Sequence, residues 1–300
     1  MKPISTITGF FSLSLVAASP VQRFDVERRA SEGRPRTLLE MAYGMRNPQE
    51  KEVPLGELEI IKIFTWVHVF TLDPMELITT TNEVIHKQME VLNTAFSPGK
   101  IYFELVGIGR GLLHDHEGFG RNGSEKLVKR LRKGDKGSLN LIFTDRIMGS
   151  SNSTDDYFMR GFTIMPGTSK DYSTDYTVVH LCSLYGRSCG HSGKGVNLGR
   201  SAVHEVGHWL GLLHVYGGDG DFVDDTPPES TSYGQVRVSV TGRNCAGPLS
   251  REGGTYANAG NIMTNAPDLC RWFFTEGQFR MMRRMWSMFR ANTDKSPSHN

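Results

Sequence analysis

Residues 204–214 of this 300-residue chain read His-Glu-Val-Gly-His-Trp-Leu-Gly-Leu-Leu-His. The first five letters form the pattern H-E-x-x-H, within a segment that we expect to be helical from Ser201 to Leu210. On a helix, His204 and His208 lie one turn apart on the same face, so both imidazoles can reach one ion. Glu205 lies beside the first histidine, where its carboxylate can hold a water molecule and take its proton. The pattern therefore predicts a hydrolytic metal site.

The extension of this pattern is more specific than its core. Gly211 follows three residues after His208, and it can end the helix because glycine adopts a left-handed conformation without a clash. The chain can then turn back and present His214 to the same ion. Three histidines with an open fourth position are typical of catalytic zinc, whereas structural zinc is usually closed by cysteines. The alternative is a set of helix-face histidines without a metal, and the added Gly and His make such a chance match rare.

The first residues predict an extracellular protein. Lys2 precedes an apolar run from Ile7 to Ala18 that ends in small residues. A run of about 12 residues is typical of a signal peptide, whereas a membrane-spanning helix needs about 20. We expect residues 1–18 to be removed and the mature chain to be secreted, without a membrane anchor. Residues 19–56 are polar and without a sustained period, which indicates a pro-segment or an N-terminal strap.

Composition excludes several classes of protein. Hydrophobic residues make up 38% of the chain and charged residues 22%, which argues against a disordered or multispan membrane protein. The 34 basic residues nearly balance the 32 acidic ones, for a formal net charge of +2. Without a basic excess there is little to neutralise phosphates, so we expect no nucleic-acid partner. We expect a monomer.

Strands and helices alternate along the chain, which indicates an α/β layer with a largely parallel sheet. The expected strands are Glu59–Phe70, Lys100–Val106, Ser138–Phe143, Gly161–Met165 and Tyr176–Leu181. Besides the helix of the histidines, we expect helices from the cap Asp73 to Phe96, over Ser124–Lys133, and from the capping box at Thr275–Gln278 onward. The last helix carries Phe279, Met282, Met285 and Phe289 on one face, as core packing. The four tryptophans are also expected mostly in the core, at 66, 209, 272 and 286.

Secretion changes how the cysteines are interpreted. Cys182, Cys189, Cys245 and Cys270 are expected to pair in an oxidising compartment, with three connectivities open. Asn122 and Asn152 each begin a glycosylation sequon in a polar stretch.

Two weaker groups of residues could bind further ions. His114-Asp115-His116 could hold a second metal, although a solvated loop is the more frequent outcome for such a run. Four aspartates, at 219, 221, 224 and 225, offer the hard oxygen donors that calcium prefers, but no complete calcium-loop pattern is present.

The zinc helix resembles that of the metzincin zinc peptidases, and most closely their pappalysin branch with its small secreted fungal members. Further similarity spans about residues 57–290. It is carried by Asn197-Leu198-Gly199-Arg200, Leu131-Arg132-Lys133-Gly134, Gly161-Phe162, Asp225-Thr226-Pro227, Asn261-Ile262-Met263 and Phe274-Thr275.

This resemblance implies the fold, the site and the activity. The fold would be a metzincin catalytic domain over residues 57–292, with a twisted five-stranded mixed sheet, an active-site helix, a Met-turn and a C-terminal helix, followed by a flexible tail at 293–300. It implies that the three histidines bind one zinc ion, that Glu205 is the general base and that Met263 is the Met-turn residue below the metal. The substrate would lie extended along the edge strand Gly161–Met165. The activity would be that of a secreted zinc endopeptidase acting on extracellular proteins.

The resemblance also pairs Cys245 with Cys270, which leaves Cys182 with Cys189. One departure from the family concerns the tyrosine two residues after the Met-turn methionine, which is Asn265 here. Because this tyrosine helps stabilise the transition state, its replacement keeps open a second hypothesis. The chain would then be a weak or silent metzincin scaffold that binds a protein partner.

Overall fold

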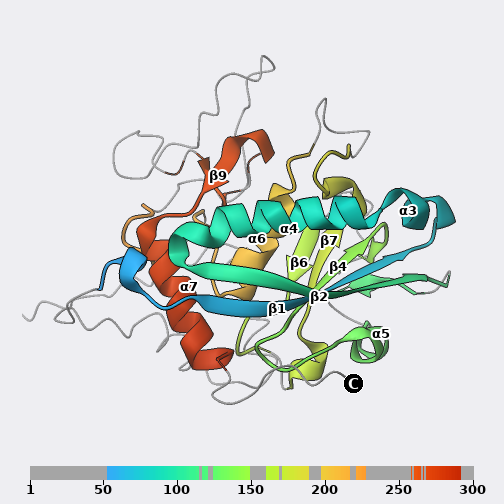
Figure 1. The fold of residues 1–300 in the computed structure, drawn as a ribbon, viewed down its shortest axis with the longest axis horizontal. Helices are drawn as coiled ribbons and strands as arrows, with labels where there is room; N and C mark the ends of the chain where they lie inside the picture. The colour runs from blue at the N-terminus through green and yellow to red at the C-terminus, as the bar shows by residue number, and fades with distance from the viewer. Residues whose placement is uncertain are drawn as a thin grey trace, which may run out of the picture.

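A five-stranded sheet forms the centre of the protein, as the alternation of strands and helices predicts (Figure 1). The computed structural model describes residues 53–114, 117–120, 124–148, 160–168, 171–188, 197–216, 221–227, 258, 260–264, 266 and 268–291. The strand order in this sheet is β2-β1-β4-β7-β6. Neighbouring strands run parallel except β6, which is antiparallel to β7. The expected mixed sheet of a metzincin is confirmed.

The elements follow in this order. The strands of the main sheet are β1 (Ile61–Thr71), β2 (Ile101–Leu112), β4 (Leu139–Thr144), β6 (Gly161–Thr163) and β7 (Thr177–His180). The helices are α3 (Pro74–Thr79), α4 (Asn82–Phe96), α5 (Glu125–Leu131), α6 (Arg200–Trp209) and α7 (Glu276–Phe289). Short strands pair as β3 (Phe119–Gly120) with β5 (Ile147–Met148) and as β8 (Gly260–Asn261) with β9 (Arg271–Phe273). Single 3-10 turns are η1 (Leu55–Glu57), η2 (Ser97–Gly99), η3 (Tyr172–Thr174), η4 (Leu181–Ser183) and η5 (Asp268–Cys270).

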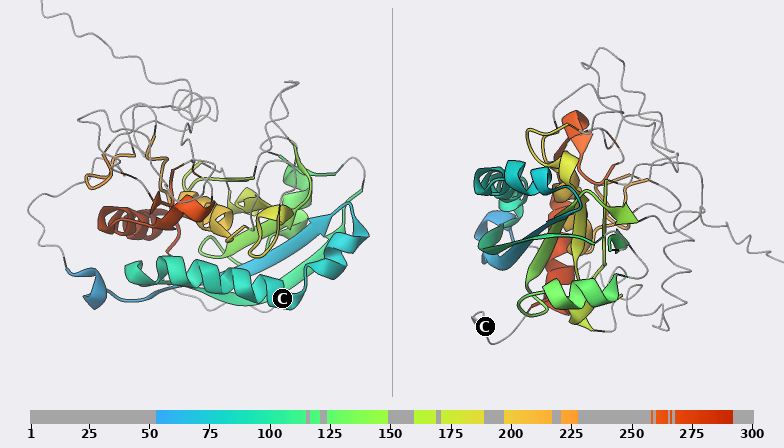
Figure 2. Two further views of the ribbon diagram at one scale, coloured as in Figure 1. Left: turned by 90° about the horizontal axis from the view of Figure 1, so that it is seen from above. Right: turned by 90° about the vertical axis from the view of Figure 1, so that its right-hand side faces the viewer.

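Each face of the sheet buries its own hydrophobic core. Residues alternate between the two faces of a strand, and Ile63, Val67 and Val69 of β1 are fully buried on the face that α4 and α6 cover. On the opposite face, Phe162 and Val178 pack in a second cluster that includes side chains of α5. In Figure 1, α4 lies above the strands and α5 below them. In Figure 2, α7 lies at one end of the sheet, away from α3 and α5. Helix α6 is therefore held inside the larger core.

The single helix expected from Asp73 to Phe96 is wrong. Helix α3 ends at Thr79 and α4 begins at Asn82. Thr80 and Thr81 lie between them, directly after Thr79 at the end of α3, and β-branched residues favour helices less than unbranched ones. The hydroxyl of Thr81 accepts a hydrogen bond from the amide of Val84 at 3.4 Å, which caps a new helix instead of continuing the old one.

Several expectations lie outside the described residues. They concern the signal peptide and most of the strap at 19–56, Asp115 and His116, the glycosylation acceptors Asn122 and Asn152, Asp219, Asn265 and the tail. Of the cysteines, Cys182 and Cys270 are described and both form disulfides, whereas Cys189 and Cys245 are not described. The pairing therefore stays a prediction. Within the described ranges, no helix is long and apolar enough to cross a membrane.

Of the four tryptophans expected in the core, Trp209 is fully buried and Trp272 is 49% exposed. The core assignment of Trp272 is wrong. Its strand β9 belongs to the small β8-β9 pair rather than to the main sheet, and its indole lies against Gly260.

Candidate metal centre

Helix α6 is capped at its start by a residue from a distant part of the chain. Gly199 at the N-cap has φ 73° and offers no side chain to the amides of the first turn. Asp268 supplies the missing acceptor, because its Oδ2 accepts hydrogen bonds from the amides of Leu198 and Arg200 at 3.1 and 3.0 Å. Asp268 is buried and also pairs with buried Arg271. A carboxylate at this end of a helix is favourable both as a cap and toward the helix dipole.

The three histidines of the sequence pattern meet at one point. The Nε2 atom of His204 lies 3.1 Å from that of His208 and 3.1 Å from that of His214, and the last two are 3.0 Å apart. In the described part of the chain they are the group of potential ligand atoms close enough to hold one ion. His204 is the most buried of the three, and burial, together with the neighbouring histidines, lowers its pKa well below the usual value. It is therefore neutral.

The outer ring nitrogens fix the tautomers of two of these histidines. His204 donates from Nδ1 to the carbonyl oxygen of Ile262 at 2.8 Å, and His208 donates from Nδ1 to that of Leu212 at 2.7 Å. A carbonyl oxygen only accepts, so each Nδ1 carries the proton and each Nε2 keeps its lone pair. Two unprotonated nitrogens at 3.1 Å repel one another unless a cation lies between them.

The triangle of nitrogens fits a zinc ion. Zinc binds histidine nitrogen at about 2.0–2.1 Å in a tetrahedral arrangement, which places ligand nitrogens about 3.3 Å apart. The separations of 3.0–3.1 Å agree with this value within a few tenths of an ångström. An ion on this triangle would keep one tetrahedral position open on the side away from the three rings.

Glycine shapes the chain on both sides of His208. Gly211 has φ 94°, and a Cβ atom there would lie 2.6 Å from Cγ of Met285 in α7. Both features require glycine, and the turn that it makes returns the chain so that His214 reaches the triangle. Gly207, inside the helix, leaves room for the side chain of Met263, because a Cβ atom there would lie 2.7 Å from its Sδ.

Met263 lies directly beneath the metal-site helix. Its side chain is fully buried, and its amide donates to Oδ1 of Asn261 at 2.8 Å. Asn261 in turn donates to Oε1 of Gln278, which closes the capping box of α7. The loop of Met263 is thus tied both to α6 and to α7.

Glu205 lies on α6 between the three histidines and β6, and it is 8% exposed. The hydroxyl of Thr163 in β6 donates to the main-chain oxygen of Glu205 at 2.9 Å. The edge strand is therefore in direct contact with the residue that sequence reasoning assigns as the base.

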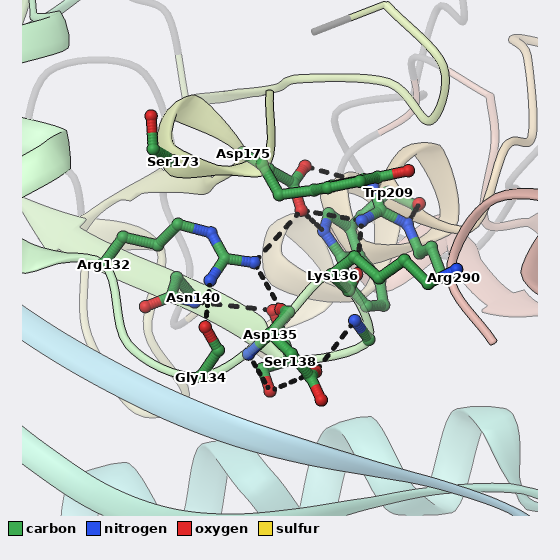
Figure 3. A network of polar contacts seen from close by, with 12 residues as sticks. Arg132, Gly134, Asp135, Lys136, Ser138, Asn140, Ser173, Asp175, Trp209 and Arg290 are labelled. Carbon is green, nitrogen blue, oxygen red and sulfur yellow. Dashed lines mark hydrogen bonds and ion pairs between the residues drawn. The ribbon is translucent and has the colours of Figure 1, made fainter. Parts of the chain in front are cut away.

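A buried charged network, which no sequence motif marks, holds the C-terminal end of α6 (Figure 3). Asp175 accepts from Nε1 of Trp209 at 3.1 Å and from both terminal nitrogens of Arg290 at 2.7 and 3.1 Å. Arg290 also donates from Nε to the carbonyl oxygen of Trp209 at 2.9 Å. Trp209 directly follows His208, a member of the histidine triad, so this network fixes the end of α6 to α7.

Two aspartates of residues 221–227, Asp221 and Asp225, contact the start of α7. Asp225 accepts from the hydroxyl of Thr275 and the amide of Gly277 at 2.7 and 2.8 Å, at the start of the helix. Burial raises the pKa of Asp221 to about 6, although Thr226 and the amide of Val223 donate to it. These oxygens are already engaged by protein donors, and calcium binding here stays a prediction.

Comparisons with known proteins agree with this site. The family model described as peptidase M43, pregnancy-associated plasma protein-A, matches residues 182–287. "Extracellular metalloprotease 1" of Coccidioides posadasii is 31% identical over 238 residues, covering 77% of this chain and 79% of that protein. An extracellular metalloprotease of Podospora anserina is 33% identical over 224 residues, covering 71% and 68%. Mature mirolysin of Tannerella forsythia, solved with a cleaved peptide, shares the fold with a TM-score of 0.52 at 22% identity, covering 75% of this chain and 90% of that one. Because it combines the triad of His204, His208 and His214 with these relatives, the chain belongs to the pappalysin family of metalloproteases.

Proposed function

We propose that this protein is a secreted zinc endopeptidase that hydrolyses peptide bonds of extracellular proteins. The observation that carries the proposal is the convergence of three histidine Nε2 atoms within 3.1 Å, two of them held in the metal-binding tautomer by main-chain carbonyls. Glu205 follows the first ligand on the same helix. This donor set suits zinc, and the relatives are named extracellular metalloproteases.

Each residue of the site has a distinct part in hydrolysis. Zinc held by His204, His208 and His214 would supply a Lewis acid that polarises the scissile carbonyl group. Glu205 takes a proton from the attacking water and passes it to the leaving amine, because a carboxylate can serve as base and then as acid. Asn265 stands where the family has a tyrosine, and its shorter amide would stabilise the transition state less well.

The peptide would bind along β6, the last strand of the sheet in the described ranges. Arg160 accepts a main-chain hydrogen bond from His180, and Ile164 donates one to Tyr176. In an antiparallel pair the inward and outward positions alternate, so the intervening Gly161 and Thr163 direct their N–H and C=O groups to the free edge. An extended peptide can add to such an edge as a further strand.

The rest of the chain fits a secreted precursor. We propose that residues 1–18 are a signal peptide and residues 19–56 a pro-segment or strap before the catalytic domain at 57–292. The names of the relatives support export.

Hydrolysis of casein by the purified zinc-loaded protein tests the proposal. Cleavage should stop when a chelator removes zinc and return when zinc is added back. A protein that binds one zinc ion through the three histidines and leaves casein and gelatin intact would contradict it. That result would favour instead a scaffold that binds a protein partner.

A further inference from the structure

Gly161, in the edge strand, is in contact with the side chain of Glu205. A Cβ atom built on Gly161 would lie 2.8 Å from Cγ of Glu205 and 2.9 Å from its Oε1. Real Cβ atoms essentially never approach other heavy atoms so closely, so any larger residue at 161 must displace the Glu205 side chain or the strand. The same Cβ would lie 2.7 Å from the main-chain oxygen of Val178 in β7. The backbone of β7 is fixed by pairing on both sides, so a small shift of β6 must relieve the contact with Val178, while the contact with Glu205 can be relieved by movement of its side chain.

Thr163, two positions further along β6, holds the main chain of Glu205. Its hydroxyl donates to the main-chain oxygen of Glu205 at 2.9 Å. Positions two apart in a strand share a face, so Gly161 and Thr163 both point to α6, while Phe162 between them is buried in the second core. One residue of β6 thus binds the backbone of Glu205, and the other leaves space for its carboxylate.

We propose that Gly161 is a positioning residue for hydrolysis. The missing side chain lets β6 approach α6 so closely that the Glu205 carboxylate stands beside the edge that would bind the peptide. This inference rests on the proposed function of Glu205 as the base. It also explains why glycine stands in a strand, where it is otherwise unfavourable for lack of a side chain to pack.

The position of Gly161 separates catalysis from binding. An alanine at 161 keeps its N–H and C=O groups, so the edge can still bind an extended peptide. The added methyl group displaces the carboxylate, and a misplacement of about 1 Å can cost about 100-fold in rate. Gly161→Ala should therefore lower kcat about tenfold to 100-fold and leave KM within about threefold of the wild-type value.

A thermal-unfolding cycle tests the contact without relying on activity. The zinc-loaded wild type, Gly161→Ala, Glu205→Ala and the double variant are compared. Gly161→Ala should lower the unfolding midpoint, and in the Glu205→Ala background the fall should shrink to about half or less, because one of the two clashes is gone. Equal falls in both backgrounds would show that 161 and 205 are not coupled and would overturn the inference.

Two further variants complete the experiment. Gly109→Ala adds a methyl group in the opposite edge strand β2. The nearest atom to this methyl group would be Nδ1 of His68 at 3.2 Å, and kcat should stay unchanged. Thr163→Val removes the hydroxyl donor without adding bulk, and kcat should fall about threefold to tenfold. This variant decides the question if Gly161→Ala does not fold, and an unchanged kcat would then overturn the inference. If Glu205→Gln keeps full activity, the proposed base is wrong, while coupling in the unfolding cycle would still establish the contact.

Discussion

The guanidinium group of Arg290 lies on the indole ring of Trp209, with its central carbon 3.7 Å from the ring centroid. The same group pairs with Asp175, which also accepts from the indole nitrogen. Arg290 is 1% exposed, so both charges have left water completely. A buried pair of this kind costs little while it is intact and a great deal when one partner is removed.

Asp175→Asn should therefore destabilise the protein strongly. The change leaves Arg290 without its counter-ion, and buried Arg132 lies only 4.0 Å from the same carboxylate. Removing one partner of a buried pair typically costs about 3–5 kcal/mol in the free energy of unfolding. Denaturation in guanidinium chloride measures the loss. Glu104→Gln breaks the exposed pair with Lys62 and should cost less than about 1 kcal/mol, and a similar cost for both variants would contradict the argument.

Glu205→Gln should abolish peptide hydrolysis and leave zinc bound. The amide keeps the shape of the side chain but cannot accept the proton of the attacking water, and the three histidines are unchanged. General bases contribute at least about 100-fold to the rate. Elemental analysis checks that zinc is still bound, and cleavage of a peptide substrate measures the loss of hydrolysis. Activity above about a tenth of the wild-type value would rule out Glu205 as the base.

Gly207→Ala should destabilise the protein although alanine favours helices. In an exposed helix this change stabilises by about 1 kcal/mol, because glycine is the poorer helix former. Here the new methyl group would overlap the buried Sδ of Met263, at 2.7 Å, and overpacking costs about 1–3 kcal/mol. Equilibrium unfolding measures the sign of the effect. Gly56→Ala, with nothing within 4 Å of the added Cβ, is the matched control and should not destabilise.

His68 should make stability depend on pH. Its Nε2 donates to Oδ1 of Asn140 at 3.0 Å, and burial lowers its pKa below the ordinary value. The folded state thus binds fewer protons at His68 than the unfolded state does. The stability that the neutral His68 contributes above about pH 6.5 is therefore lost as the pH falls through the folded pKa. The free energy of unfolding should fall more between pH 7.5 and 5.5 in the wild type than in His68→Gln, which keeps a donor to Asn140. Parallel pH profiles would show that His68 has no such effect.

Non-reducing peptide mapping should find Cys245 linked to Cys270 and Cys182 linked to Cys189. The first bridge closes a loop over residues 246–269 and should stabilise by about 3 kcal/mol in the chain-entropy model. Cys182 and Cys270 are both already oxidised in the structure. A crosslink between Cys182 and Cys245 would contradict the pairing, which the family resemblance implies.

The local features of the site could be predicted from the sequence, and the long-range ones could not. The histidine spacing and the glycine after it are consequences of helix geometry within eleven residues. The cap Asp268 lies 68 residues from the amide of Arg200, and Asp175 lies 115 residues from Arg290. No period or spacing marks such partners, because they meet only through the packing of the whole fold. The prediction of a single helix from Asp73 to Phe96 failed for a different reason. The helical spacing of apolar residues continues across the threonines at which the helix is interrupted.

The supports of the metal-site helix have a consequence for the order of synthesis. A nascent chain that has emerged as far as His214 contains all three histidines, yet it lacks the carbonyl group of Ile262, the cap Asp268 and the clamp Arg290. All three supports are translated later. Domains generally fold as units during synthesis. We therefore expect this site to form only when nearly all of the chain has left the ribosome, so that a truncated product would carry the ligands without a competent enzyme.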